Sequence, residues 1–229
     1  MFYFNLIPEE ELCTLAEYKR DLWLDRLTKL SDTVATAFST HKGDIYLNGL
    51  TELSDAAAVK LSSNEGAIAL NGLTELSDTA AKALSTHQGT LWLNGLTELS
   101  DIAAAELSRH KGTLVLNGLK KPSDKVVSGL SAHQGTLWLN GLNELSDIAA
   151  AELSKHQGTL RLLGLKELSD TAAEALSKHQ GVLSLENLRT PLSIFIDQDC
   201  LRADTPAEMS ASTGHLALAR FLAARTSEG

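Results

Sequence analysis

The sequence predicts an α/β solenoid, a curved array of 23-residue strand–turn–helix units with a parallel sheet on its concave face and helices on its convex face. Two observations carry this prediction. The string Gly-x-Leu-x-Leu-Asn-Gly-Leu-x-x-Leu-Ser-Asp recurs every 23 residues along most of the 229-residue chain, and such fixed periods are typical of repeat architectures. Within each copy, alternating apolar residues give way to helical spacing. A curve is expected because parallel strands stack about 4.8 Å apart, whereas packed helices need about 8–10 Å.

Seven full copies and a partial eighth make up the predicted array, residues 20–188. The first copy, 20–42, is divergent, and the eighth decays after Leu188. One unit cannot bury its own apolar face, so several copies must stack to form a continuous core. The later copies open with glycine at the same position: Gly43, Gly66, Gly89, Gly112, Gly135, Gly158 and Gly181.

Each copy is expected to begin with a short strand and a turn. In 91–93 two leucines flank Trp92, so the leucines point to the core and the tryptophan points outward. The turn follows at Asn94-Gly95. Because glycine holds this seventh position in six consecutive copies and Asn187 holds it in the last, we expect a positive φ there.

A short helix is expected to complete each copy. Ser100 is predicted to cap the helix, and Asp101 to lie in its first turn beside the positive end of the helix dipole. The apolar stripe within 103–107 predicts about two helical turns. Gly112 is expected just past the end of the helix.

These residues resemble the leucine-rich repeat family, most closely its cysteine-containing type. The pattern L-x-L-x-x-C-x-x-I-T-D of that type is matched by Leu91-x-Leu93-x-x-Leu96-x-x-Leu99-Ser100-Asp101. The sequence departs from the pattern at Leu96, where the family usually has cysteine or asparagine, so an all-leucine spine replaces a polar one. The resemblance covers the array 20–188 and implies a solenoid that binds a partner rather than catalyses a reaction.

The two ends of the chain lack the repeat and are interpreted as caps. Solenoids need such caps because an open end exposes the core. In 1–19 a capping helix is expected from Pro8 to about Lys19. In 189–229 the pattern predicts a last strand at 193–197 and a helix at 215–225.

Charge and composition argue against several classes of function. A net charge of −9 argues against nucleic acid or an anionic membrane as the partner. No apolar run is long enough to span a bilayer and no signal-peptide pattern is present, so a cytoplasmic location is expected. Cys13 and Cys200 fall in opposite caps, which is too far apart for a disulfide. No catalytic motif is found, and we expect neither enzymatic activity nor a metal or cofactor.

A column of aromatic residues is the strongest candidate for a functional surface. These rings are expected to line the concave face, and, because large and small residues alternate, to leave slots between rings about 10 Å apart. Tryptophan and tyrosine are enriched in binding hot spots. The column, the middle strand residue of each copy, runs Trp23, Tyr46, Ala69, Trp92, Val115, Trp138, Arg161, Ser184 and contains all three tryptophans of the chain.

Three functions fit this column. The first is a non-enzymatic scaffold that binds a protein or peptide partner through Trp23, Tyr46, Trp92 and Trp138. The second is a carbohydrate-binding module in which the same rings stack against sugars. The third is a structural spacer whose rings only shield the sheet.

Charged residues flank the column at its two ends. Asp21, Asp25 and Asp44 make the first copies acidic, and Arg161 lies toward the other end. A bound partner would therefore be oriented with a basic group near Trp23. The position of Asp25 continues in later copies as asparagines, whose amides are expected to bond one another or the turn: Asn48, Asn71, Asn94, Asn117 and Asn140.

Two further ladders are expected at the ends of the helices. The first contains six of the seven histidines, about 5 Å apart, with Asn64 in the missing slot. We interpret them as neutral rings that tie helix ends to the neighbouring backbone, because a linear ladder does not converge on one metal ion. The second contains the aspartates that start the helices, for which a role at the helix N-terminus is favoured over calcium binding. The histidines are His41, His87, His110, His133, His156 and His179, and the aspartates are Asp32, Asp55, Asp78, Asp101, Asp124, Asp147 and Asp170.

Copy 112–134 departs from the others on its helix side. It carries Lys120, Lys121 and Lys125 around Pro122. The sequence leaves two interpretations of this basic surface open, a second contact patch on the convex face or simple drift.

Overall fold

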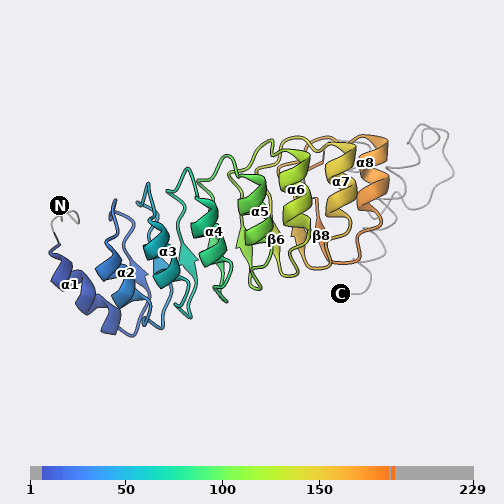
Figure 1. Ribbon diagram of the computed structural model, residues 1–229. Helices are drawn as coiled ribbons and strands as arrows, with labels where there is room; N and C mark the ends of the chain where they lie inside the picture. The colour runs from blue at the N-terminus through green and yellow to red at the C-terminus, as the bar shows by residue number, and fades with distance from the viewer. Residues whose placement is uncertain (1–6, 186, 189–229) are drawn as a thin grey trace, which may run out of the picture.

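The computed structural model shows an α/β solenoid and describes residues 7–185 and 187–188 (Figure 1). Seven successive coils each contain a strand followed by a helix, and an eighth strand follows them. The helices form one row along the molecule, with the strands behind them in the view of Figure 1. The strand and helix predicted at 193–197 and 215–225, and Cys200, lie outside the described residues.

The strands form one parallel sheet in the order of the chain. Neighbouring strands pair at an offset of one repeat, so that Leu22 lies beside Ile45 and Trp23 beside Tyr46. This register confirms that equivalent positions of the repeat form columns in space. The strands are β1 Leu22–Trp23, β2 Ile45–Tyr46, β3 Ile68–Ala69, β4 Leu91–Trp92, β5 Leu114–Val115, β6 Leu137–Trp138, β7 Leu160–Arg161 and β8 Leu183–Ser184.

The helices that follow the strands are seven or eight residues long, close to the two turns predicted from the apolar stripe. Within the part of the chain that the structure describes, none is long and apolar enough to cross a membrane. They are α2 Asp32–Phe38, α3 Asp55–Leu61, α4 Asp78–Leu84, α5 Asp101–Leu107, α6 Asp124–Ser131, α7 Asp147–Leu153 and α8 Asp170–Leu176.

Leucine and alanine fill the core between the sheet and the helices. In the fourth coil Leu91, Leu93 and Leu96 are fully buried from the strand side, and Ala103 and Leu107 are fully buried from α5. Burial of one leucine side chain contributes about 1.5–3 kcal/mol, so the repeated leucines are the main source of stability. Leu96 confirms that an apolar spine occupies the position where cysteine or asparagine was the alternative.

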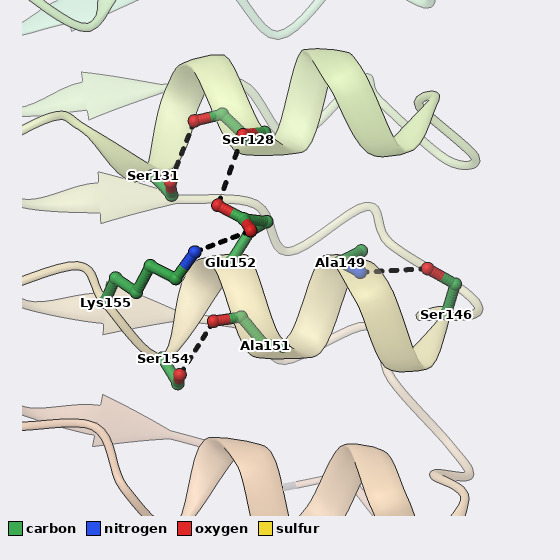
Figure 2. A network of polar contacts seen from close by, with 8 residues as sticks. All are labelled: Ser128, Ser131, Ser146, Ala149, Ala151, Glu152, Ser154 and Lys155. Atoms are coloured by element: carbon green, nitrogen blue, oxygen red, sulfur yellow. Dashed lines mark hydrogen bonds and ion pairs between the residues drawn. The ribbon is translucent and has the colours of Figure 1, made fainter.

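A serine caps each helix of the array, as the sequence predicts. The Ser146 hydroxyl accepts a hydrogen bond from the backbone N–H of Ala149 at 2.9 Å, and Figure 2 shows this cap beside the polar contacts of α6 and α7. In the same view Glu152 accepts from Ser128 of α6 at 3.2 Å and pairs with Lys155 at 2.6 Å. The Lys155 ammonium is the main cause of the lowered pKa of Glu152.

Most of the capping serines also bond the preceding coil. Ser77 donates from its hydroxyl to Asp55 Oδ1 at 2.5 Å, and Ser54 donates to Asp32 in the same way at 2.8 Å. The helix-starting aspartates therefore have a structural role between coils, in addition to their place at the helix N-terminus. Asp101 is an exception, since its carboxylate faces Lys125 Nζ at 3.8 Å instead.

Removal of this double contact is expected to destabilise the fold measurably. Ser77→Ala loses both a cap and an inter-coil bond, so we expect a loss of about 2 kcal/mol. Ser123→Ala removes only the capping hydrogen bond, which Val126 N–H donates to the Ser123 hydroxyl at 3.2 Å. It should therefore cost about 1 kcal/mol or less. Urea unfolding of both variants measures the difference, and equal losses would show that the inter-coil bond contributes nothing.

The N-terminal cap is shorter than the sequence suggests. The expected helix from Pro8 to about Lys19 is α1 Glu9–Thr14, followed by a single 3₁₀ turn, η2 Leu15–Glu17. This N-terminal segment packs against α2. Ser31, the N-cap residue of α2, donates its hydroxyl hydrogen to Glu9 Oε1 at 2.5 Å. The cap thus covers the helix side of the first coil.

The repeated glycines have a different role from the one predicted. Among the described residues no backbone φ is positive, so the expectation of a left-handed turn at Gly95 is wrong. A Cβ placed on Gly95 would lie well within 3.0 Å of the backbone oxygens of Asn71 and Leu73 in the preceding coil. Glycine is needed between these coils because the neighbouring backbones approach too closely for a side chain, whereas in the last copy Asn187 occupies the position and its amide donates to Leu163 O at 2.7 Å.

The glycine after each helix is likewise not a helix cap. α5 ends at Leu107, and Ser108 closes it in a right-handed conformation, so Gly112 lies several residues beyond the helix. A Cβ at Gly112 would collide with the backbone oxygen of Gly89. Both glycine positions are explained by the close stacking of coils, which no single repeat reveals.

Candidate functional site

The aromatic column lies on the solvent side of the sheet and its first rings form a continuous stack. Trp23 and Tyr46, from the paired strands β1 and β2, stack with ring centroids 3.8 Å apart and an interplanar angle of 5°. The other side of the Tyr46 ring faces Trp92 at 6.0 Å and 23°. Trp23 remains 63% exposed. The stack therefore presents one open indole at the N-terminal edge of the sheet.

The slot predicted between Tyr46 and Trp92 is closed. Their strands are two positions apart, about 10 Å, yet the ring centroids are only 6.0 Å apart, because the rings lean toward each other above Ala69. Ala69 is 1% exposed, and so is Val115 in the next small position of the column. The small residues are covered by their neighbours and do not form receptacles for a ligand side chain.

At the other end of the column, Arg161 packs on Trp138. The guanidinium carbon lies 4.4 Å from the ring centroid, and the two residues are direct register partners on β6 and β7. Sequence reasoning placed Arg161 in the column but did not find this cation–π contact. The signal for this contact is that consecutive copies carry Trp138 and Arg161 at the same repeat position. An aromatic and a cationic residue on neighbouring strands are placed to form a cation–π contact.

The acidic residues near the first rings are tied into the backbone of the next coil. Asp21 Oδ1 accepts the N–H of Asp44 at 3.1 Å, and Asp44 Oδ1 accepts the N–H of Ala67 at 2.8 Å. Asp25 Oδ1 accepts both the backbone N–H and the side-chain amide of Asn48, at 3.2 and 2.7 Å. Each aspartate thus has a structural bond in addition to its charge.

The asparagine column continues the contact that Asp25 begins. Asn48 Oδ1 accepts the backbone N–H of Asn71 at 3.1 Å and its amide at 2.7 Å, and the backbone bond repeats in later coils as far as Leu163. This agrees with the prediction that the amides bond one another or the turn: each Oδ1 accepts a backbone N–H of the next turn, and Asn48 also accepts the amide of Asn71. The ladder holds the strands in register and leaves the rings of the column as the distinctive groups of the sheet face.

Three carboxylates of the first two coils act electrostatically on the ring stack. The pKa of the Tyr46 hydroxyl is raised, mainly by desolvation and then by the charges of Asp44, Asp21 and Asp25. In the described part of the chain none of these three carboxylates forms a salt bridge. The stack therefore combines π-faces with carboxylates that have no salt-bridge partner among the described residues.

The histidine ladder is buried and regularly stacked. Neighbouring rings from His87 to His179 lie 5.9–6.0 Å apart, with interplanar angles of 3–11°. Asn64, in the missing slot, donates to the backbone oxygen of His41 at 2.7 Å, and His41 Nδ1 lies 3.2 Å from the oxygen of Ala16. These two residues tie one coil to the preceding backbone in the way the sequence predicts.

The inner rings of the ladder have a lowered pKa. Desolvation lowers the pKa of His87, His110 and His156, and it lowers that of His133 to about 4, with a further contribution from the neighbouring rings His110 and His156. Backbone groups of the preceding coil lie near these nitrogens and oppose the shift, but their contacts do not reach hydrogen-bond geometry. These imidazoles are neutral at pH 7.

Within residues 7–185 and 187–188, no group of three or more histidine, cysteine, aspartate or glutamate side chains is arranged to hold a metal ion.

The basic surface of copy 112–134 is largely neutralised by neighbours. Lys121 pairs with Glu144 at 2.9 Å, and Lys125 lies 3.8 Å from Asp101. The sheet face is thus the better candidate for a binding surface.

Compared with known protein families and with curated proteins, the chain matches no family model and no curated sequence.

Proposed function

We propose that the chain is a non-enzymatic binding scaffold of the leucine-rich repeat type, which binds a polypeptide partner on the ring-bearing face of its sheet. The observation that supports this most directly is that Trp23 is 63% exposed on the solvent side of the sheet, next to a column of side chains that are tied into hydrogen-bonded ladders. An exposed indole held in place by a stacked neighbour is preorganised for contact.

A polypeptide suits this face better than a sugar does. Sugar-binding platforms require open ring faces, but Tyr46 is stacked between Trp23 and Trp92, and Trp138 is covered by Arg161. One open ring face, that of Trp23, remains at the end of the column that carries the carboxylates, and the guanidinium of Arg161 lies toward the other end. An extended chain can follow this column and match its charges. A carbohydrate-binding module and a structural spacer are the alternatives.

The double variant Trp92→Ala/Trp138→Ala is expected to weaken partner binding at least tenfold and to remain folded. Ala69 shows that alanine is accommodated at this position of the column. Peptides selected from a random display library on the wild-type protein supply the ligands, and their affinities for both proteins are compared by calorimetry.

The matched control is Ile102→Ala/Ile148→Ala, which changes two exposed apolar residues of helices α5 and α7. Selected peptides should bind this control as they bind the wild type. The carbohydrate-binding module would be favoured by a different result: the library gives no binding peptide, and soluble glycans quench the tryptophan fluorescence. Selected peptides that bind the Trp92→Ala/Trp138→Ala variant unchanged would contradict the proposal.

A further inference from the structure

Among residues 7–185 and 187–188, no strand pairs with the outer edge of β1. Throughout the array, backbone N–H groups of one coil donate to backbone oxygens of the next: Leu22 N–H donates to Asp44 O and Leu24 N–H to Tyr46 O, both at 2.8 Å. The equivalent oxygens of the first coil belong to Asp21 and Trp23. No described residue donates to them.

In the described part of the chain the N-terminal cap leaves the solvent side of this edge uncovered, whereas Leu22 and Leu24 on the core side are only 5% exposed. α1 and η2 pack against α2 on the helix side, and Trp23 is 63% exposed. Asp21 and Asp25 are also exposed. Two free carbonyl oxygens at a sheet edge are acceptors for the N–H groups of an added strand.

The side chains at this edge specify what the added strand should carry. Asp21 lies just before β1, Trp23 lies in it and Asp25 lies in the turn that follows, and all three side chains are exposed in the first coil. Each carboxylate uses Oδ1 to accept hydrogen bonds from the second coil, and neither forms a salt bridge with a described residue. One face of Trp23 is covered by Tyr46, which leaves the face toward the outer edge for a ligand.

The molecule contains an internal example of the contact that this face would make. Arg161 is the register partner of Trp138 on the adjacent strand, and its guanidinium lies over the indole at 4.4 Å. An arginine placed opposite Trp23 on an added strand would lie over the open indole in the same manner. At that position the arginine would also lie between the carboxylates of Asp21 and Asp25. Among the described residues, Arg161 does not lie between two carboxylates.

We propose that β1 accepts a parallel strand from a basic polypeptide, and that an arginine of that strand stacks on Trp23 between Asp21 and Asp25. The residues before and after the arginine donate their N–H groups to Asp21 O and Trp23 O, following the pattern of the other coils. Their side chains point to the core side, where Leu22 and Leu24 are already buried against the apolar core, so they should be small and apolar. This inference rests on the proposed function and names the partner segment as apolar–arginine–apolar.

The probe is the fluorescein-labelled, amidated peptide Thr-Val-Arg-Val-Thr, with binding measured by fluorescence anisotropy. Replacing arginine by citrulline, which has the same shape but no charge, should weaken binding about tenfold. Methylation of the two valine nitrogens should have an effect of at least that size, because it removes both donors to the edge. Higher salt should weaken the arginine peptide and leave the citrulline peptide unchanged.

The charge is tested on the protein by Asp21→Asn/Asp25→Asn. Asparagine already occupies the position of Asp25 in the next coil and accepts the same backbone N–H there, so this variant retains the ladder and loses only the charges. We expect about tenfold weaker binding of the arginine peptide. Trp23→Leu should weaken it similarly, and Ile148→Ala, an exposed apolar residue of α7 on the helix side of the array, should bind it as the wild type does.

Equal affinity for the arginine and citrulline peptides, unchanged binding by Asp21→Asn/Asp25→Asn, or no binding at millimolar peptide would each overturn the inference. These outcomes are separable from failure of the proposed function. Library-selected peptides that depend on Trp92 and Trp138, but not on Asp21 and Asp25, would retain the scaffold function and reject the β1 site.

Discussion

Replacement of Gly95 by alanine is expected to destabilise the protein by about 3 kcal/mol or more. The new methyl group would lie well within 3.0 Å of the backbone oxygens of Asn71 and Leu73. Backbone atoms of a packed coil cannot rotate away as a flexible side chain can, so the coils must separate. Urea unfolding followed by circular dichroism measures the loss, and it should appear as a lower midpoint.

Gly129→Ala is the matched control for this prediction. Gly129 lies inside α6, and a Cβ there would be 3.2 Å from Ala105 N and 3.3 Å from Ala104 Cβ, which is tight but not a collision. Alanine also improves helix propensity by about 1 kcal/mol, so the net change should stay within about 1 kcal/mol. If Gly95→Ala were tolerated equally well, the close approach of coils would not be the reason for glycine in the turn.

Acidification from pH 7 to pH 5 is expected to lower the melting temperature, because protonation of the histidine ladder favours the unfolded chain. In the unfolded chain a histidine has a pKa near 6.5, whereas burial lowers the pKa of His133 to about 4. Between these values the unfolded state binds more protons, so the stabilisation is complete above about pH 6.5 and is lost as the pH falls. His133 alone should account for about 2 kcal/mol at pH 5.

His110→Asn/His133→Asn tests whether the ladder causes this loss. Asparagine occurs naturally in the same column at Asn64, where it donates to the backbone oxygen of His41, so the substitution is expected to preserve the fold. The melting temperature of the variant should depend less steeply on pH between 7 and 5, a range in which most carboxylates remain ionised. A wild-type melting temperature that is constant over this range would refute the prediction.

The elements that sequence reasoning predicted correctly depend on contacts within one repeat or on its strict period. Strand, turn, serine cap and two-turn helix follow from local pattern, and the constant spacing places Trp23 beside Tyr46 without any knowledge of the fold. The asparagine ladder was predictable for the same reason, since a repeated amide at a turn has its own copy as nearest neighbour.

The errors arise where one coil meets the next. The turn glycine was assigned a positive φ because glycine and Asn187 share the position, but the structure shows crowding by the preceding backbone. The slot between Tyr46 and Trp92 was expected from strand spacing alone, and the rings instead lean over Ala69. The tilt of a ring and the clearance between backbones depend on the three-dimensional position of the neighbouring coil. Aligned repeat sequences do not contain that information.

The sequence by itself determined the class of fold, the register of the sheet and the composition of every column, because a fixed period leaves only one way to align neighbours. The tertiary structure decided which members of those columns remain accessible. In the described part of the chain the cap packs on the helix side and leaves the solvent side of the β1 edge open, and Tyr46 covers one face of Trp23 and leaves the other exposed. Accessibility depends on what packs against each surface, and that is a property of the assembled coils rather than of any one repeat.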